Sequence, residues 1–120
     1  MTPLGLSQSA LSMTLGRYRS RLHALIQALA QAKPGFVHSN TYNALEELSQ
    51  ALEVDLEVRR SDPGRERMTR LEAEVLVPLL SDLHRDLARL LRERPSNAWL
   101  ATLHGADQRV AAVERSLAEP

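Results

Sequence analysis

The clearest structural signal in this chain is the stretch from Leu11 to Leu29, LSMTLGRYRSRLHALIQAL. Its apolar residues recur at steps of three and four, which return to one side of an α-helix and predict a helix with one buried face. Three more ladders of the same kind follow, and together the four predict an all-α fold. The ladder residues are Leu11, Leu15, Tyr18, Leu22, Leu25 and Leu29; Leu45, Leu48, Leu52 and Leu56; Met68, Leu71, Val75, Leu79, Leu83, Leu87 and Leu90; and Trp99, Leu103, Ala106, Val110, Val113 and Leu117.

Proline, glycine and capping residues separate the ladders. Pro34 and Gly35 end the first helix, Asp62-Pro63 opens the third, and Pro95 separates the third from the fourth. The predicted helices span about residues 7–33, 40–60, 63–94 and 97–118 of a single domain, residues 1–120. Because the three connections are short, we expect an antiparallel up-down-up-down four-helix bundle.

The composition narrows the classes of function. The 15 basic and 15 acidic residues cancel, so no overall field attracts nucleic acid or an anionic membrane. The absence of cysteine excludes disulfides and thiolate chemistry. No apolar run reaches the ~18 residues of a membrane span, and we expect a cytoplasmic protein. Fourteen of the 15 basic residues are Arg, which is typical of a GC-rich, bacterial-type genome.

Six successive apolar residues, VLVPLL at 75–80, give the third helix more apolar surface than one buried stripe needs. Pro78 lacks a backbone donor and predicts a kink in this helix. We expect some of these side chains to point away from the bundle, with Leu76, Val77 and Leu80 as the candidate interface of a symmetric homodimer. The alternative is a bent helix that buries the excess within its own bundle.

Three of the four aromatic residues fall at one end of the predicted bundle. They are Phe36, Tyr42 and Trp99, with His38 beside them. Such a cluster could form a ligand pocket or a partner anchor, with His38 or His104 as its polar group. The simpler interpretation is an aromatic plug that closes the end of a leucine core.

Charge is unevenly distributed along the chain. Residues 1–38 carry four basic residues and no acid, whereas residues 39–62 carry six acids and two arginines. Folding the first hairpin about Phe36 places Arg17 and Arg19 level with Asp55 and Glu53, so we expect ion pairs between the first two helices. The same patch, with Arg21 added, could contact two or three phosphates, which is too few for useful nucleic-acid affinity at physiological salt.

Small residues flank two of the ladders. Gly105 and Ala112 lie on the fourth helix, and Ala28 lies on the first helix at the level of Gly105. Glycine costs about 1 kcal/mol in a helix interior, so we interpret Gly105 as a place where the first and fourth helices approach closely.

No motif for catalysis or metal binding emerges. The triplet at His84 resembles the start of a kinase catalytic loop, but position 91 is Leu where that loop needs Asn. None of the four histidines has an acid three residues before it, as carboxylate-bridged metal bundles require. We therefore assign no catalytic, cofactor or metal residues and do not expect an enzyme.

Three functions remain as hypotheses. The first is a non-enzymatic protein–protein interaction or scaffold module that forms a homodimer or binds another protein. The second is a small-molecule binder or small enzyme that uses the end formed by Phe36, Tyr42 and Trp99. The third is a weak Arg-dependent binder of nucleic acid or of an anionic surface.

Overall fold

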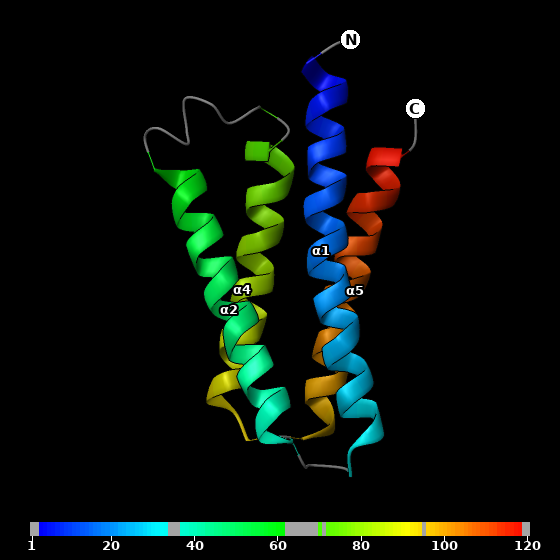
Figure 1. The fold of residues 1–120 in the computed structure, drawn as a ribbon, viewed down its shortest axis with the longest axis vertical. Coiled ribbons are helices and arrows are strands. Elements are labelled where there is room, and N and C mark those ends of the chain that lie inside the picture. The colour runs from blue at the N-terminus through cyan, green and yellow to red at the C-terminus, as the bar shows by residue number, and fades with distance from the viewer. Residues whose placement is uncertain (1–2, 34–36, 62–69, 71, 95, 119–120) are drawn as a thin grey trace.

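Four antiparallel helical segments form the fold in a computed structural model of the chain. The structure describes residues 3–33, 37–61, 70, 72–94 and 96–118. Within these residues the helices are α1 (Pro3–Gln31), α2 (Ser39–Arg60), the third helix made of η1 (Glu72–Leu76) and α4 (Val77–Arg92), and α5 (Asn97–Ala118). They run alternately down and up, so α1 begins and α5 ends at the same end of the bundle (Figure 1). The predicted all-α up-down bundle is confirmed.

Where the structure describes them, the helix ends lie within four residues of the predicted ones. Helix α1 spans Pro3–Gln31 where 7–33 was predicted, and α4 ends at Arg92 where 94 was predicted. The second and fourth predicted helices begin and end within one residue of α2 and α5. Ser96 caps α5, because its Oγ accepts a hydrogen bond from the amide of Ala98 at 3.2 Å. At α2 the capping position belongs to His38, whose side chain forms no capping hydrogen bond. The predicted turn at 34–36 and the predicted start of the third helix at residue 63 lie outside the described residues.

The third helix is irregular beside Pro78, as predicted. It is a π-helix from Glu72 to Leu76 and an α-helix from Val77 onward. Proline cannot donate a backbone hydrogen bond, and its ring crowds the carbonyl four residues earlier. A π turn moves the acceptor to the residue five positions before the donor, so the chain passes the missing donor without breaking the helix.

The leucine ladders form the core. Among the residues whose side chains are described, every buried apolar residue except Ile26, Leu76 and Leu80 belongs to a predicted ladder. The buried ladder residues are Leu11, Leu15, Leu22 and Leu25 on α1; Leu45, Leu48, Leu52 and Leu56 on α2; Leu79, Leu83, Leu87 and Leu90 on α4; and Trp99, Leu103, Ala106 and Val110 on α5. Met68 and Leu71 lie outside the residues whose side chains are described.

Two tight helix pairs make up the bundle. Helix α1 packs mainly against α5, and α2 packs mainly against α4, whereas contacts between α1 and α2 are fewer. The two pairs lie side by side in Figure 1, with α1 and α2 toward the viewer. The molecule measures 50 × 31 × 18 Å, so it is a flattened rod.

Candidate interaction face

The apolar run at 75–80 does not form an exposed surface. Leu76 and Leu80 are only 1% and 0% exposed, Leu79 is also buried, and Val77 is half-buried against the core. The expectation that Leu76 and Leu80 point away from the bundle is wrong. The run is covered because the third helix packs on α2 and α5 and, through η1, also contacts α1 across the bundle. The bent helix therefore buries the excess within its own fold.

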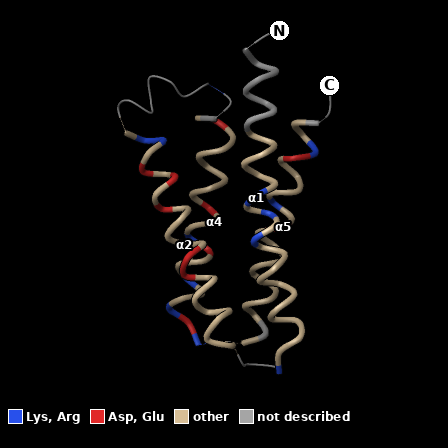
Figure 2. Tube along the Cα trace, in the orientation of Figure 1, with Lys and Arg blue, Asp and Glu red and all other residues tan. Residues whose placement is uncertain are grey.

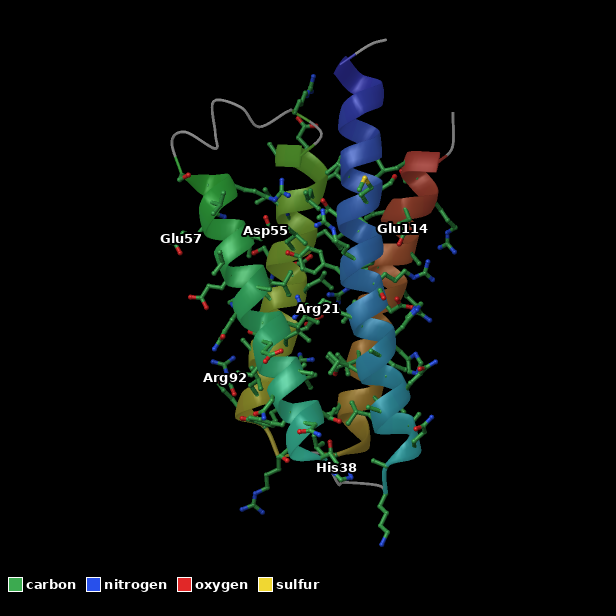
Figure 3. The ribbon with its side chains drawn as sticks, in the orientation of Figure 1. Arg21, His38, Asp55, Glu57, Arg92 and Glu114 are labelled. Atoms are coloured by element: carbon green, nitrogen blue, oxygen red, sulfur yellow. The ribbon has the colours of Figure 1, made fainter. Side chains whose placement is uncertain are left out.

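The aromatic end is a packed end of the core. Trp99 is 1% exposed, and its ring centroid lies 6.5 Å from that of Tyr42. Tyr42 donates a long hydrogen bond to the carbonyl of Leu91 at 3.5 Å. The carbonyl of His38 accepts a hydrogen bond of 2.9 Å from the amide of Tyr42, and His38, labelled in Figure 3, also lines a cleft with Lys33. Phe36 lies outside the described residues, and His104 is exposed.

The three arginines of the basic patch face in different directions. Arg19 Nε lies 3.1 Å from a carboxylate oxygen of Asp107 on α5, and Arg19 also lies 3.7 Å from Glu114. His23 shares the same Asp107 oxygen at 2.9 Å. The predicted pairing of Arg19 with α2 is therefore wrong. Arg17 and Arg21, two residues away on either side, are exposed.

Asp55 on α2 is hydrogen-bonded to Tyr18 and Arg59 and not to Arg17. It accepts a hydrogen bond of 2.6 Å from the Tyr18 hydroxyl and one of 2.7 Å from Arg59. Burial, followed by the hydrogen bond to Asp55, raises the pKa of Tyr18, since both favour the neutral phenol. This cluster joins α1 to α2 without using Arg17, so the predicted ion pair between Arg17 and Asp55 is not formed. The predicted partner Glu53 instead lies 4.0 Å from His84.

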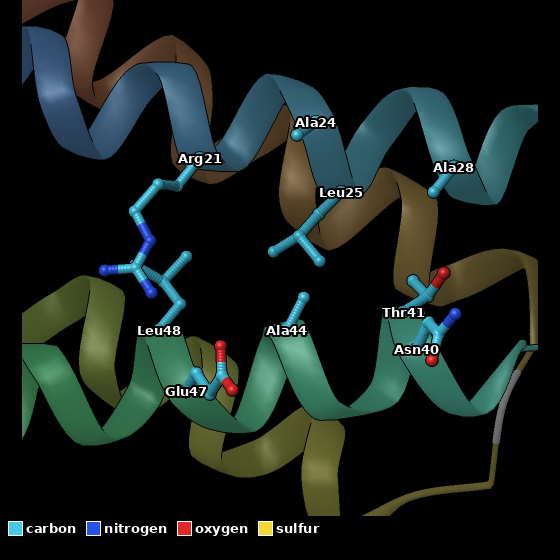
Figure 4. A pocket seen from close by; sticks show the side chains of 9 residues that line it. All are labelled: Arg21, Ala24, Leu25, Ala28, Asn40, Thr41, Ala44, Glu47 and Leu48. Atoms are coloured by element: carbon cyan, nitrogen blue, oxygen red, sulfur yellow. The ribbon is translucent and has the colours of Figure 1, made fainter.

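The expected close approach at Gly105 is also absent. A β-carbon built on Gly105 meets nothing within 4 Å. The predicted partner residue, Ala28, lies on the other flank of α1, where it faces α2 (Figure 4). The tight packing of α1 on α5 therefore does not depend on a small residue at position 105.

A cleft of about 300 Å³ lies between α1 and α2. Apolar and small side chains from both helices form most of its lining, with Arg21 and Glu47 among its charged members (Figure 4). The lining residues are Arg21, Ala24, Leu25 and Ala28 from α1, and Asn40, Thr41, Ala44, Glu47 and Leu48 from α2. The cleft exists because alanines occupy the positions where larger side chains would close the seam.

A second, shallower depression continues this cleft along α2. It shares Glu47 with the cleft and extends past Ala51 to Val54 and Val58. These two valines are 60% and 59% exposed, which is high for apolar side chains of this size. Met13 on α1 is 67% exposed. It precedes Arg17 and Arg21 at steps of four, so all three lie on the same side of the helix.

We call this surface the α1/α2 face. Its cleft and depression are lined by Arg21, Ala24 and Ala28 of α1 and by Ala44, Glu47, Ala51, Val54 and Val58 of α2. We add Met13 and Arg17 of α1, which precede Arg21 at steps of four on the same side of the helix. Sequence reasoning missed it, although the α2 residues recur at steps of three and four. The neighbouring ladder of leucines is more apolar than this stripe, and the buried side of the helix was assigned from the leucines alone.

Charged side chains between α4 and α5 are paired with one another. Arg109 on α5 lies 2.9 Å from Asp86 on α4, and Arg89 donates to the hydroxyl of Thr102 at 3.3 Å. On the α1/α2 face, Arg17, Arg21 and Glu47 form no ion pair or side-chain hydrogen bond with a described residue. Figure 2 shows basic residues in the middle of α1 and acidic residues along α2. Arg17, Arg21 and Glu47 are therefore on the same face as the exposed apolar side chains.

Among the described residues, no group of three or more His, Asp or Glu side chains is placed to hold a metal ion. No helix in that part of the chain has the length and apolar character needed to cross a membrane. Comparison with models of protein families, with curated proteins and with solved structures found no match to this chain.

Proposed function

We propose that this protein is a non-enzymatic protein–protein interaction module and that the α1/α2 face is its binding surface. One observation carries the proposal. Among the described residues, two of the four large hydrophobic side chains that are exposed, Val54 and Val58, line this face, and a third, Met13, lies on the same side of α1 as Arg21 by its helical spacing. Grouped apolar side chains next to polar residues are typical of a surface that another protein covers.

The chemistry of the cleft supports binding more than catalysis. Its charged groups are one exposed arginine and one exposed glutamate, without a histidine or a nucleophilic side chain other than Thr41. A general base needs a partner that orients it and a site from which water is excluded. An open, mostly apolar cleft offers neither, but it suits side chains from a partner helix.

The two other hypotheses have less support. A ligand site at the aromatic end needs an accessible Trp99, and this side chain is buried against Tyr42. Nucleic-acid binding through the basic patch would be weak even with three free arginines, and Arg19 is held by carboxylates of α5.

Site-specific photo-crosslinking in the native host tests the proposal. A photoreactive amino acid at position 58 should give one crosslinked product, whereas the same group at exposed Arg85 on α4 should give none. Val54→Asp introduced next to position 58 should abolish the product, because a charge at the centre of an apolar contact must be desolvated. Crosslinks from both positions, or from neither, would contradict the proposal.

A further inference from the structure

We infer that the α1/α2 face binds a second copy of this chain across a two-fold axis parallel to the helices. The inference rests on the interaction role proposed above and names the partner of that same face. It is carried by the charges that the single chain leaves unpaired, by the direction of the helices and by the size of the face.

The unpaired charges lie on opposite sides of the cleft. Arg17 and Arg21 belong to α1, and Glu47 belongs to α2. Arg21 and Glu47 line the same cleft at a similar level (Figure 4), yet they form no ion pair within one chain. The face therefore has a basic edge and an acidic edge, with small apolar side chains between them.

A two-fold axis parallel to the helices brings the basic edge of each copy against the acidic edge of the other. It places α1 of the second copy over α2 of the first at the same height, and the two helices then run antiparallel. Arg21 of each copy faces Glu47 of the other, so the contact is formed twice. A two-fold axis perpendicular to the helices within the same face would place α1 on α1 and bring arginine against arginine. Charge complementarity therefore selects the parallel axis.

The apolar side chains and the dimensions of the face agree with this arrangement. Ala24, Ala28 and Ala44 allow the helices of a second copy to approach closely. Val54 and Val58 would become covered. The side of the molecule that carries this face has an outline of 50 × 31 Å, which leaves room for the ~800 Å² per partner that a stable interface buries.

Sedimentation of charge-reversed variants tests the inference. The wild type should sediment with twice its mass of 13.4 kDa at concentrations of about 1–100 µM. Arg21→Glu or Glu47→Arg alone should weaken the dimer at least about tenfold, because each change places two like-charged pairs in the interface. Arg92→Glu on α4, an exposed site with the same charge change, should leave the dimer unchanged.

The decisive sample is an equimolar mixture of the two weakened variants. In the mixed dimer, the glutamate introduced by Arg21→Glu faces the arginine introduced by Glu47→Arg. The unchanged Arg21 of one copy faces the unchanged Glu47 of the other, so all pairs are attractive and the dimer should return. A charge pair that acts only within one chain cannot be restored by mixing. A wild-type monomer at these concentrations, or a mixture that stays monomeric, would overturn the homodimer.

The mass of the crosslinked product distinguishes a failure of the homodimer from a failure of the proposed interaction role. A crosslink from position 58 with twice the mass of the chain supports the second copy. A crosslink of any other mass would leave the α1/α2 face as a binding surface and refute the second copy as its partner. If no position on the face crosslinks, the interaction role itself is wrong.

Discussion

Replacing Leu80 by Ala should strongly destabilise the fold of the single chain. Leu80 was a candidate interface residue on sequence grounds, but it is 0% exposed and lies among the buried leucines of the third helix. If it lay on an exposed surface, its truncation would affect self-association and leave the stability of the monomer unchanged. Its burial predicts the opposite result.

The size of the effect follows from the burial. Truncating a fully buried leucine to alanine costs about 2–5 kcal/mol, which is a large part of the 5–15 kcal/mol that stabilises a typical domain. For a loss of about 3 kcal/mol and a urea m-value of about 1.5 kcal/mol/M, the unfolding midpoint falls by about 2 M. Val54→Ala provides a matched control, since its 60% exposed side chain predicts a change within about 0.5 kcal/mol.

Urea unfolding followed by circular dichroism measures both variants. The protein should be diluted until it is monomeric, so that the loss of a dimer does not lower the midpoint. Equal midpoints for wild type and Leu80→Ala would refute the buried position of Leu80. A larger loss for Val54→Ala than for Leu80→Ala would show that the exposed and buried sides of these helices are reversed.

Three further changes test other parts of the bundle. Gly105→Ala should stabilise the protein by about 0.5–1 kcal/mol, because the added β-carbon meets no atom within 4 Å and alanine is the better helix former; a loss in a chemical melt would show crowding there. Arg19→Ala should cost about 1 kcal/mol through its ion pairs with α5, whereas Arg17→Ala should cost less than about 0.5 kcal/mol; equal losses would contradict the assigned pairs. Tyr18→Phe should cost about 1 kcal/mol by removing the hydrogen bond to Asp55. The pKa of Tyr18 is raised in the fold, so its contribution is complete below the unfolded pKa of about 10 and is lost at higher pH. Unfolding of the wild type above pH 10 should therefore show a steeper loss of stability than that of Tyr18→Phe.

The leucine spacing was sufficient to predict the fold class because it is a local property. A residue three or four positions along a helix returns to the same side whatever the rest of the chain does. Leu45, Leu48, Leu52 and Leu56 are accordingly all buried on α2. The helix boundaries were predictable for the same reason, since proline and capping residues act within a few positions.

The direction of Leu76 and Leu80 could not be predicted in this way. Six successive apolar residues cover every side of a helix, so their spacing does not identify the buried side. The outcome depends on the π turn before Pro78 and on the contact of η1 with α1. Both are properties of the packed bundle. Val54 and Val58 of the α1/α2 face could not be assigned for a different reason. Their spacing is regular, but spacing does not show whether another part of the bundle covers them.

The errors at Arg19 and Ala28 have one common cause. These residues are nine positions apart, which is two and a half helical turns, so they lie on opposite flanks of α1. The sequence predicts that opposition correctly. It does not tell which flank faces α2 and which faces α5. The four helices of an up-down bundle can follow one another around the core clockwise or anticlockwise, and the same leucines are buried in both arrangements. In this bundle Arg19 faces the carboxylates of α5, and Ala28 faces α2. This arrangement of the helices thus closes the α1–α5 seam with ion pairs and leaves alanines along the α1–α2 seam, which is why the cleft lies on that face.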